Sequence, residues 1–326
     1  MPATQANLAP AELAPFPARE QQHCVPKGSC DSHCHVLGPI AKFPYALERH
    51  LDPPEAPLEA LEELWRSFGF ERAVIVQSIV HGSDHSAVID ALERGGGRYR
   101  GVALLNPETP DSEIARLHSK GFRGARVQFM PERGPVLPPD EIAALLGRVR
   151  DYDWHIALHL SGRAVADYED LFASLPVRIV IDHMARLNLG EGPDGASVGA
   201  LKRLLDRGDV WVKLSGADRI AADMPSLDDA IDLARTLAEH APDRVLWGSD
   251  SPHVGVRPNF PGDQALVDAI DAIAPTAAAR RLMLVDNPTA CFDLPRMETP
   301  TNHEAYNAAQ AHARGARYSG GGTRKS

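Results

Sequence analysis

Short apolar runs rich in β-branched residues alternate with amphipathic stretches along most of the chain. Eight of these runs are predicted to be strands, at residues 30–36, 72–77, 100–105, 122–129, 154–160, 177–183, 210–216 and 244–250. Helix-like stretches separate them, and two further helices are expected at about 264–272 and 277–285. Nearly continuous apolar strands are typical of parallel sheets that are covered on both faces. Eight strand–helix repeats therefore predict an α/β fold, a (β/α)8 TIM-like barrel.

The end of the first strand argues against the main structural alternative. An open, doubly wound sheet would place a glycine-rich phosphate loop there, but the sequence at 33–35 is His-Cys-His. A long insert follows at 37–57 and is a candidate lid. We expect an N-terminal arm at 1–27, the barrel at 28–295 and a polar C-terminal tail at 296–326. Whether the protein forms a homo-oligomer in which this tail lies on a neighbouring subunit stays open.

The composition of the chain argues against several classes of function. The 326 residues carry a formal net charge of −10 and no run of lysine or arginine, which argues against nucleic acid as a partner. No apolar run approaches the roughly 18–20 residues of a membrane span, and the N-terminus lacks the basic and apolar parts of a signal peptide. The four cysteines form no C-x-x-C motif, which suits free thiols in a reducing cytosol. We therefore expect a cytoplasmic protein that binds neither membranes nor nucleic acids.

Histidine and carboxylate residues fall at the predicted carboxyl ends of four strands. Five such groups are expected there: His33, His35, His159, His183 and Asp250. Because strand side chains alternate between faces, Asp31 should share a face with the two histidines of the first strand, and Ile179 and Ile181 should share a face with His183. Barrel enzymes carry their catalytic groups at the carboxyl ends of the strands, so these five groups should converge.

Such a cluster is typical of metal-assisted hydrolysis. His33, His35, His159 and Asp250 would supply nitrogen and oxygen ligands to one Zn²⁺ and leave a position for water. The ion lowers the pKa of a bound water to about 7, and Asp250 can accept the water proton as a general base. His183 would be a further ligand or would polarise the carbonyl group under attack.

Three arginines indicate the charge of the substrate. Arg123 and Arg126 lie on the fourth strand, Arg219 follows the seventh, and arginine binds carboxylates and sulfonates through paired hydrogen bonds. A small anionic molecule is therefore the expected ligand. Two roles stay open for Lys213, that of a buried core residue and that of a substrate contact. One metal ion is favoured over two. Further residues that could contact the ligand lie in the insert or just past strand ends: Tyr45, His50, Gln77 and His253.

Several of these segments together resemble the amidohydrolase superfamily. They are DSHCHVLGP, KFPY, GFRGARVQF, VIDHMARLN, VKLSGADR and VLWGSDSPH, and the resemblance covers about residues 28–295. Within the superfamily they resemble the branch of 2-pyrone-4,6-dicarboxylate and 4-sulfomuconolactone hydrolases. The resemblance implies a distorted barrel and hydrolysis of small lactones in aromatic-compound catabolism. It also implies active-site roles for His33, His35, His183 and Asp250, and anion-binding roles for Arg123, Arg126 and Arg219.

His159 distinguishes the two activities of this branch. The pyrone dicarboxylate hydrolases work without a metal, and their fifth strand offers no histidine, whereas His159 restores the metal-binding set of the superfamily. The resemblance therefore favours a zinc enzyme that converts 4-sulfomuconolactone to maleylacetate and sulfite. The alternatives are a metal-free 2-pyrone-4,6-dicarboxylate hydrolase, a lactone isomerase, a decarboxylase of an aromatic acid and, outside enzymes, a non-catalytic barrel that binds an anion.

Overall fold

The computed structural model describes residues 25–47, 49, 51–130, 138–221, 224, 226–255 and 260–296. The arm predicted at 1–27 and the tail predicted at 296–326 lie almost wholly outside these residues, as does His50. The described residues up to Leu294 belong to one compact unit, and this unit contains all the predicted strands.

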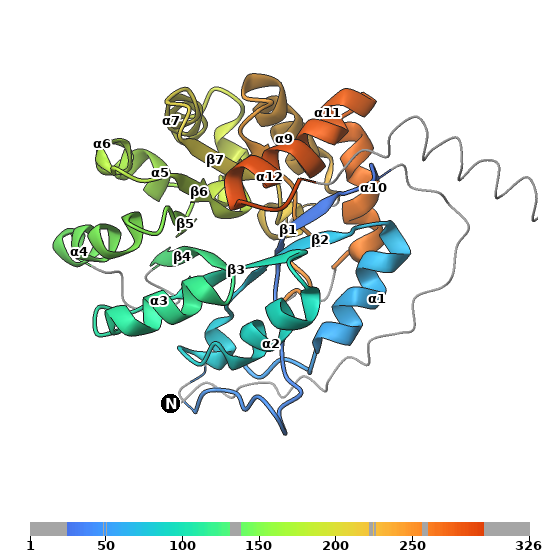
Figure 1. Ribbon diagram of the computed structural model, residues 1–326. Helices are drawn as coiled ribbons and strands as arrows, with labels where there is room; N and C mark the ends of the chain where they lie inside the picture. The colour runs from blue at the N-terminus through green and yellow to red at the C-terminus, as the bar shows by residue number, and fades with distance from the viewer. Residues whose placement is uncertain are drawn as a thin grey trace, which may run out of the picture. The chain divides into compact units, whose positions relative to one another are not determined.

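Eight parallel strands follow one another around the sheet in the order of the sequence (Figure 1). They are β1 (Cys30–Cys34), β2 (Arg72–Val76), β3 (Tyr99–Leu104), β4 (Phe122–Phe129), β5 (His155–Leu160), β6 (Ile179–Ile181), β7 (Val210–Lys213) and β8 (Val245–Leu246). Each pairs with the next in parallel register. The predicted α/β barrel is confirmed, although β6 and β8 are much shorter than their apolar runs.

Helices cover the outside of the sheet because each buries one apolar stripe. In α1 the buried residues Leu58, Leu61, Trp65 and Phe68 recur at helical spacing. The helices are α1 (Leu58–Phe68), α2 (Ser86–Gly95), α3 (Asp111–Ser119), α4 (Pro139–Arg150), α5 (Ala164–Asp167), α6 (Glu169–Ser174), α7 (Ala196–Leu205), α8 (Ala217–Ile220), α9 (Asp228–His240), α10 (Asp263–Ile273), α11 (Ala277–Arg281) and α12 (Asn287–Phe292). Shorter turns are η1 (Ile79–His81), η3 (Asp182–Arg186), η4 (Leu189–Glu191) and the π-turn η5 (Leu282–Asp286).

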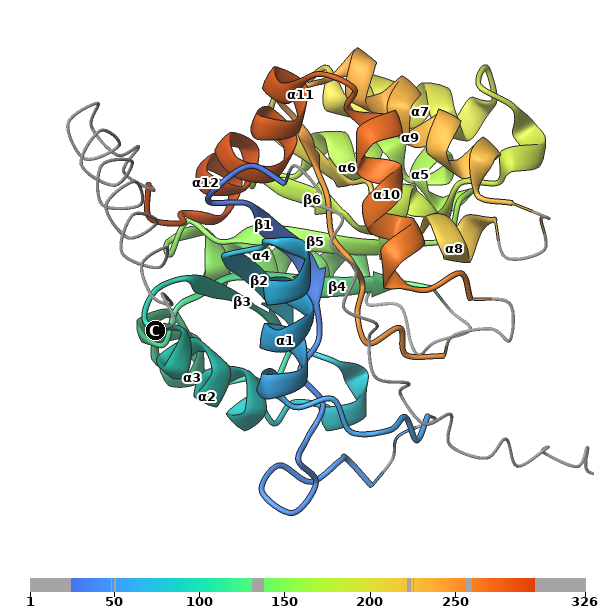
Figure 2. The same cartoon turned by 90° about the vertical axis from the view of Figure 1, so that its right-hand side faces the viewer.

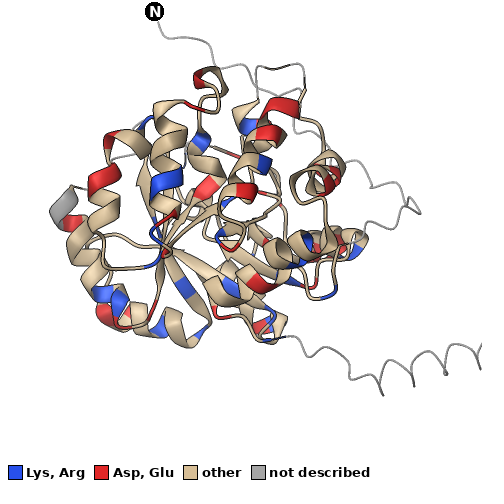
Figure 3. Ribbon diagram, turned by 90° about the horizontal axis from the view of Figure 1, so that it is seen from above, with Lys and Arg blue, Asp and Glu red and all other residues tan. Residues whose placement is uncertain are grey.

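The core has two parts. A large apolar cluster lies between the strands and the helices, and a smaller one, with Val74, Ala157, Val180 and Leu246, fills the barrel interior. Acidic and basic residues are interspersed along the outer helices (Figure 3). Within the described part of the chain, no helix combines the length and apolar character needed to cross a bilayer. The inward positions beyond the inner cluster, at the carboxyl ends of the strands, are left for polar residues.

Backbone hydrogen bonds between the segment after β8 and β1 bring the two ends of the sheet together. Ser32 N donates to Trp247 O over 2.9 Å, and Asp250 N donates to His33 O over 2.8 Å. Asp31 strengthens this closure, since its carboxylate accepts from Ser249 N at 2.9 Å and Ser249 Oγ at 2.6 Å. The closure sets the histidines of the first strand beside Asp250.

The insert between β1 and α1 lies next to the loop after β2, as Figure 2 shows. Ala46 N donates to Val80 O over 2.8 Å, and Leu37 and Ala56 form a bridge at the base of the insert. This position puts the insert beside the carboxyl ends of β1 and β2.

Candidate functional site

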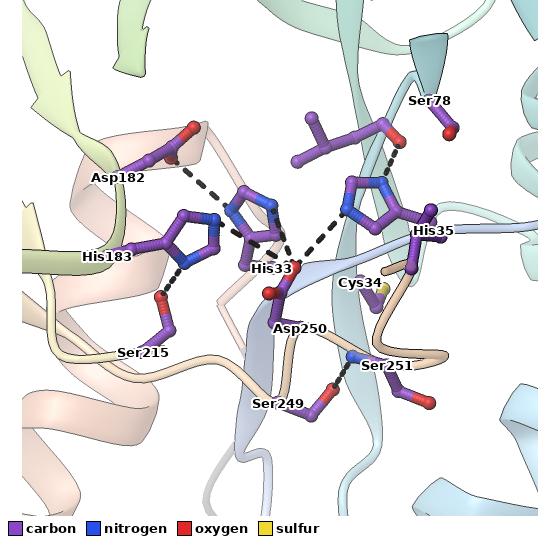
Figure 4. Close-up of polar contacts among 12 residues, drawn as sticks. His33, Cys34, His35, Ser78, Asp182, His183, Ser215, Ser249, Asp250 and Ser251 are labelled. Carbon is purple, nitrogen blue, oxygen red and sulfur yellow. Dashed lines mark hydrogen bonds and ion pairs between the residues drawn. The ribbon is translucent and has the colours of Figure 1, made fainter. Parts of the chain in front are cut away.

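Three buried histidines surround the carboxylate of Asp250 (Figure 4). Asp250 Oδ1 lies 3.4 Å from His35 Nε2, 3.6 Å from His33 Nε2 and 3.8 Å from His183 Nε2. The histidines come from β1, the residue after β1 and the turn after β6, while Asp250 follows β8. The structure therefore brings together four of the five groups expected at the carboxyl ends of the strands.

The first strand departs from simple alternation. Its register with β2 shifts between Asp31 and Cys34, and such an irregularity changes which side chains share a face. Asp31 faces the outer layer, where it accepts a hydrogen bond from Trp65 Nε1 at 3.1 Å, whereas His33 faces Lys213 inside the barrel. The expectation that Asp31 would project with the histidines is wrong: it ties β1 to Ser249 and α1.

Gly248 allows the segment after β8 to lie directly on His33. A Cβ atom at this position would lie 2.6 Å from His33 N and 2.7 Å from His33 Cβ. We expect Gly248→Ala to lower the free energy of unfolding by about 1–3 kcal/mol, as overpacking does in cores, and to displace His33. Urea unfolding checks this, with Gly147→Ala as the control because no atom lies within 4 Å of that Cβ position. Equal stabilities of Gly248→Ala and wild type would contradict it.

Hydrogen bonds from Nδ1 fix the orientation of two rings. His35 Nδ1 lies 2.8 Å from Val76 O, and His159 Nδ1 lies 2.8 Å from Gln128 Oε1. Because these oxygens only accept, Nδ1 carries the proton in both rings, and in the neutral form of such a ring Nε2 keeps a lone pair. His183 Nδ1 lies 2.9 Å from Ser215 Oγ, a hydroxyl that can donate or accept. The Nε2 atoms of His35 and His159 are therefore available as acceptors or metal ligands.

Burial keeps His33, His159 and His183 neutral. It lowers the pKa of His33 to about 3, with the charge of Lys213 acting in the same direction. Burial likewise holds the pKa values of His159 and His183 well below the usual range, and for His159 the charge of Arg126 adds to the effect. Neutral imidazole is the form that binds a metal ion.

Burial opposes the charge of Asp250, but the charge of Arg219 outweighs this effect. Arg219 Nε donates to Asp250 Oδ2. The guanidinium charge of Arg219 holds the pKa of Asp250 well below its usual range despite burial. Asp250 is therefore an ionised proton acceptor at neutral pH.

A second carboxylate, which the sequence pattern did not indicate, lies beneath the site. Asp182 Oδ1 lies 3.1 Å from Lys213 Nζ and 3.3 Å from His33 Nδ1, and Asp182 Oδ2 accepts from Arg126 Nε at 3.0 Å. Lys213 Nζ is also 3.0 Å from His33 Nδ1. Although burial opposes it, the charge of Lys213 holds the pKa of Asp182 well below its usual range. Lys213 is thus part of a buried ionic network that contacts both His33 and Arg126.

The turn after β6 explains why Asp182 was overlooked. Ile179 and Ile181 pack outward against the helices, so by alternation Asp182 takes the inward position after Val180. His183 reaches the site through left-handed backbone conformation, with φ of 53°. The expectation that His183 shares a face with the two isoleucines is wrong. Alternation from Val180 alone would have identified Asp182.

A pocket with about 480 Å³ of empty space opens above these groups. Among the described residues it is lined by His35, Leu51, Ser78, Ile79, Arg126, Gln128, His159, His183, Arg186, Arg219, Asp250 and Val254. Two of the three predicted arginines, Arg126 and Arg219, therefore line it, and Leu51 is the contribution of the insert. Ser78, Gln128 and Arg186 are lining residues that the sequence analysis did not select, although the last two stand in quoted motifs.

Arg123 does not reach this pocket. It is the second residue of β4 and lies at the amino end of the strand, opposite the site. Its guanidinium donates to Asp293 Oδ2 at 3.1 Å and to His118 O at 3.1 Å. The expectation that three named arginines meet at one barrel end is wrong for Arg123, because the length of β4 separates it from Arg126 and Gln128.

Three other residues that were predicted to contact the ligand interact with other parts of the chain. Tyr45 packs in an apolar cluster with Leu37 and Val80. Gln77 Nε2 donates to the carbonyls of Gly82 and Asp84, both at 2.9 Å, and so shapes the loop after β2. His253 Nε2 lies 2.7 Å from Asp263 Oδ1 at the start of α10. None of the three is among the described residues that line the pocket.

Two overlapping groups have metal-ligand spacing. The ligand atoms of His33, His35 and Asp250 lie within 4.8 Å of one another, as do those of His33, Asp182 and His183. In the second group the Lys213 ammonium already contacts Asp182 and His33, so the first group suits a cation better.

His159 stands apart from both groups. Its ring centroid is 5.7 Å from that of His183, and its Nε2 is buried with no hydrogen-bond partner among the described residues. His159 lies on the side of the pocket where Gln128 and Arg126 lie. Of the four expected ligands, His33, His35 and Asp250 therefore form one group, and His159 lies apart from it.

Comparisons with known proteins show the family to which the chain belongs. A family model described as amidohydrolase matches residues 30–294. A 2-pyrone-4,6-dicarboxylate hydrolase from Comamonas testosteroni is 37% identical over 280 residues, covering 83% of this chain and 92% of the relative. A 4-sulfomuconolactone hydrolase from Rhizobium radiobacter is 37% identical over 295 residues, covering 90% and 99%. A solved structure from Agrobacterium tumefaciens has a TM-score of 0.72 at 28% identity, covering 83% of this chain and 98% of that chain. The chain therefore belongs to the amidohydrolase family.

Proposed function

We propose that this protein hydrolyses a small anionic lactone. The observation that carries the proposal is the ionised, buried Asp250, which lies within 3.8 Å of three imidazole nitrogens in a pocket lined by three arginines. Relatives named as lactone hydrolases, at 37% identity over most of their length, support it. A pocket of this size suits a molecule of one small ring with its substituents.

The residues present fit a single Zn²⁺. His33 Nε2 is buried without a hydrogen-bond partner among the described residues, and His35 Nε2 and Asp250 Oδ1 complete a compact set of two imidazoles and one carboxylate. This is the donor set of catalytic zinc sites, which keep a position open. When bound, the ion would act as a Lewis acid and lower the pKa of water. His183 or His159 would be the further protein ligand.

The chain's own residues account for the remaining steps. Asp250 accepts a proton from the attacking water as the water oxygen bonds to the ring carbonyl carbon. The ring C–O bond then breaks, and the proton passes to the leaving oxygen. Arg219, which donates to Asp250, keeps this carboxylate ionised and oriented. Arg126, anchored on Asp182, binds an anionic substituent of the substrate.

The substrate that we favour is 4-sulfomuconolactone, with maleylacetate and sulfite as products. Ring opening leaves a hydroxyl and a sulfonate on one carbon. The C–S bond then breaks, its electron pair leaves with sulfite, and the hydroxyl loses its proton to become the keto group of maleylacetate. The zinc-type ligand set and the additional His159 support this choice. A metal-free 2-pyrone-4,6-dicarboxylate hydrolase is the second candidate. It is favoured by an equally similar relative and by the separation of His159 from the compact ligand group.

Elemental analysis of protein purified without added metal or chelator tests the choice. We expect about one zinc per chain, loss of 4-sulfomuconolactone hydrolysis after chelation, and recovery when zinc is returned. Turnover of 2-pyrone-4,6-dicarboxylate is measured in the same samples. Protein free of metal that hydrolyses the pyrone at full rate would overturn the zinc proposal and establish the second candidate.

Alanine variants separate the histidine roles. We expect His35→Ala to weaken zinc binding by about 100-fold or more, beyond the 10–100-fold typical of outer residues, measured by competition with a chelator. His253→Ala, which removes a ring bonded to Asp263, is the control and should leave zinc affinity unchanged. If His159→Ala also releases zinc, His159 is a ligand. If zinc stays and KM rises, His159 contacts the substrate instead.

A further inference from the structure

A buried lysine lies beside the candidate zinc ligands and has no part in the proposed reaction. Lys213 is the last residue of β7, and its side chain is wholly buried inside the barrel. Its Nζ atom contacts His33 and Asp182 and lies 5.9 Å from the ring centroid of Phe292. Burying a charge is costly, so a buried ammonium group is expected where its partners need it. The contacts of Lys213 therefore direct attention to His33.

The hydrogen bond between Lys213 and His33 has a defined direction. Lys213 Nζ lies 3.0 Å from His33 Nδ1 in hydrogen-bonding geometry. An ammonium group has three donors and no lone pair, so it can only donate, and His33 Nδ1 must accept. In a neutral imidazole one ring nitrogen accepts and the other carries the proton. The contact with Lys213 therefore places the ring proton of His33 on Nε2.

Asp182 is the competing partner for the same ring nitrogen. Its Oδ1 atom lies 3.3 Å from His33 Nδ1 and could accept a proton from it. Among the described residues, however, this oxygen makes no contact with hydrogen-bond geometry, although it lies 3.1 Å from Lys213 Nζ. The shorter contact of Lys213 therefore decides which ring nitrogen holds the proton. Without Lys213, His33 Nδ1 would donate to Asp182, and the lone pair would lie on Nε2.

The two histidines of the first strand segment differ in this respect. His35 Nδ1 lies 2.8 Å from the carbonyl oxygen of Val76, so Nδ1 carries the proton, and the neutral ring has its lone pair on Nε2. Both Nε2 atoms face Asp250 Oδ1, at 3.4 Å and 3.6 Å (Figure 4). A metal ion needs a lone pair on each nitrogen ligand. His33 must therefore move its proton to Nδ1 and lose the bond from Lys213 before it can bind a metal ion, and its ring is neutral in both arrangements.

We propose that Lys213 is a positioning residue that holds the ring proton of His33 on Nε2 and thereby weakens metal binding by the group His33, His35 and Asp250. Asp182 is the partner that accepts from Nδ1 when His33 becomes a ligand. The inference rests on the proposed function for the identity of the metal ion, zinc. The position of the ring proton is a property of the metal-free protein and does not require turnover.

Zinc titration in competition with a chelator tests the effect on affinity. We expect Lys213→Met to bind zinc about 10–100-fold more tightly than wild type, because one hydrogen bond from a charged group no longer has to be broken. Arg126→Met is the matched control. It removes another cation that donates to Asp182, at 3.0 Å, but that has no contact with His33 among the described residues, so it should tighten zinc binding much less. Unchanged affinity in Lys213→Met, or equal tightening in both variants, would overturn the inference.

Nitrogen-15 NMR of the metal-free protein reads the ring proton directly, because a ring nitrogen that carries a proton and one with a lone pair have distinct chemical shifts. The signals of His33 are identified by their loss in His33→Gln. We expect the proton on Nε2 in wild type and in Lys213→Arg, which keeps a cationic donor, and on Nδ1 in Lys213→Met. A proton on Nδ1 of wild type would overturn the inference even if the variants fail to fold.

The zinc titrations separate this inference from the proposed function. Zinc binding by Lys213→Met but not by wild type would support the inference and reject zinc as the natural cofactor. Equal zinc binding by the two proteins would leave the zinc proposal standing and overturn the inference. Absence of zinc binding from both proteins would overturn the two together.

Discussion

Replacing Asp250 with asparagine is expected to lower kcat for lactone hydrolysis by about 10²–10⁴-fold, the usual contribution of a general base. Asparagine keeps the shape of the side chain and can still accept from Arg219, but it cannot take a proton from water. The buried carboxylate is in the protonation state that this role requires, because Arg219 holds its pKa well below the usual range and keeps it ionised at neutral pH. Steady-state kinetics at saturating lactone measure the effect.

Two controls make the result specific to proton transfer. Zinc content and thermal unfolding of Asp250→Asn should be measured beside kcat, since the same carboxylate belongs to the candidate ligand group. Asp263→Asn changes a carboxylate that pairs with His253 at 2.7 Å, away from the pocket lining, and should retain turnover. Full activity of Asp250→Asn would make the general-base role untenable and would return the protein to a barrel that only binds an anion.

The second large effect is on stability. Asp182→Ala is expected to lower the free energy of unfolding by about 3–5 kcal/mol, because it leaves the buried cations Lys213 and Arg126 without their shared carboxylate. It should also raise KM, since Arg126 loses its anchor. Urea unfolding monitored by circular dichroism gives the stability. The control is Asp206→Ala, which removes an exposed partner of His240 and should change stability by less than about 0.5 kcal/mol.

The effect of Asp182 should depend on pH and on its partner. The pKa of Asp182 is lowered in the folded protein, so its contribution is fully present above the unfolded-state value of about 3.9 and declines as pH falls below it. Combining Asp182→Ala with Lys213→Met should cost less than the sum of the two single changes, by at least about 1 kcal/mol. Additive losses would mean that the pair does not interact as its 3.1 Å separation suggests.

Long apolar strands and periodic helices were predictable because their patterns repeat over many residues. The helices expected at about 264–272 and 277–285 match α10 and the continuous segment of α11 and η5 closely. His159 also lies inward with Ala157, as alternation predicts, while Ile156, Leu158 and Leu160 pack outward. In such regular elements one face is buried against a defined layer, so the side-chain period alone sets the direction.

The sequence predicted which residues form the site better than it predicted how these residues are arranged. The irregularity in β1 turned Asp31 away from His33, and the left-handed turn after β6 brought His183 into the site although Ile179 and Ile181 face outward. No periodic pattern encodes such local backbone changes. The turn after β6, for example, needs the space left by Gly162 and Gly216 in neighbouring loops, where an added Cβ would lie 2.6 Å from Arg186 O and 3.0 Å from His183 Cβ. The predicted position of Arg123 was wrong for a different reason. A motif indicates the strand on which a residue lies, but the position of the residue along β4 decides which end of the barrel its side chain reaches.

The closure of the barrel by Asp31 and Ser249 also has a consequence for synthesis. These two residues are 218 positions apart, which at 5–20 residues per second corresponds to roughly 10–40 s of translation. Throughout this time β1 has an open edge on one side, and the carboxylate of Asp31 lacks its serine partner. Exposed strand edges invite pairing with other chains. Nascent chains that stop before Ser249 should therefore aggregate or recruit chaperones, and the site cannot assemble until nearly the whole barrel has left the ribosome.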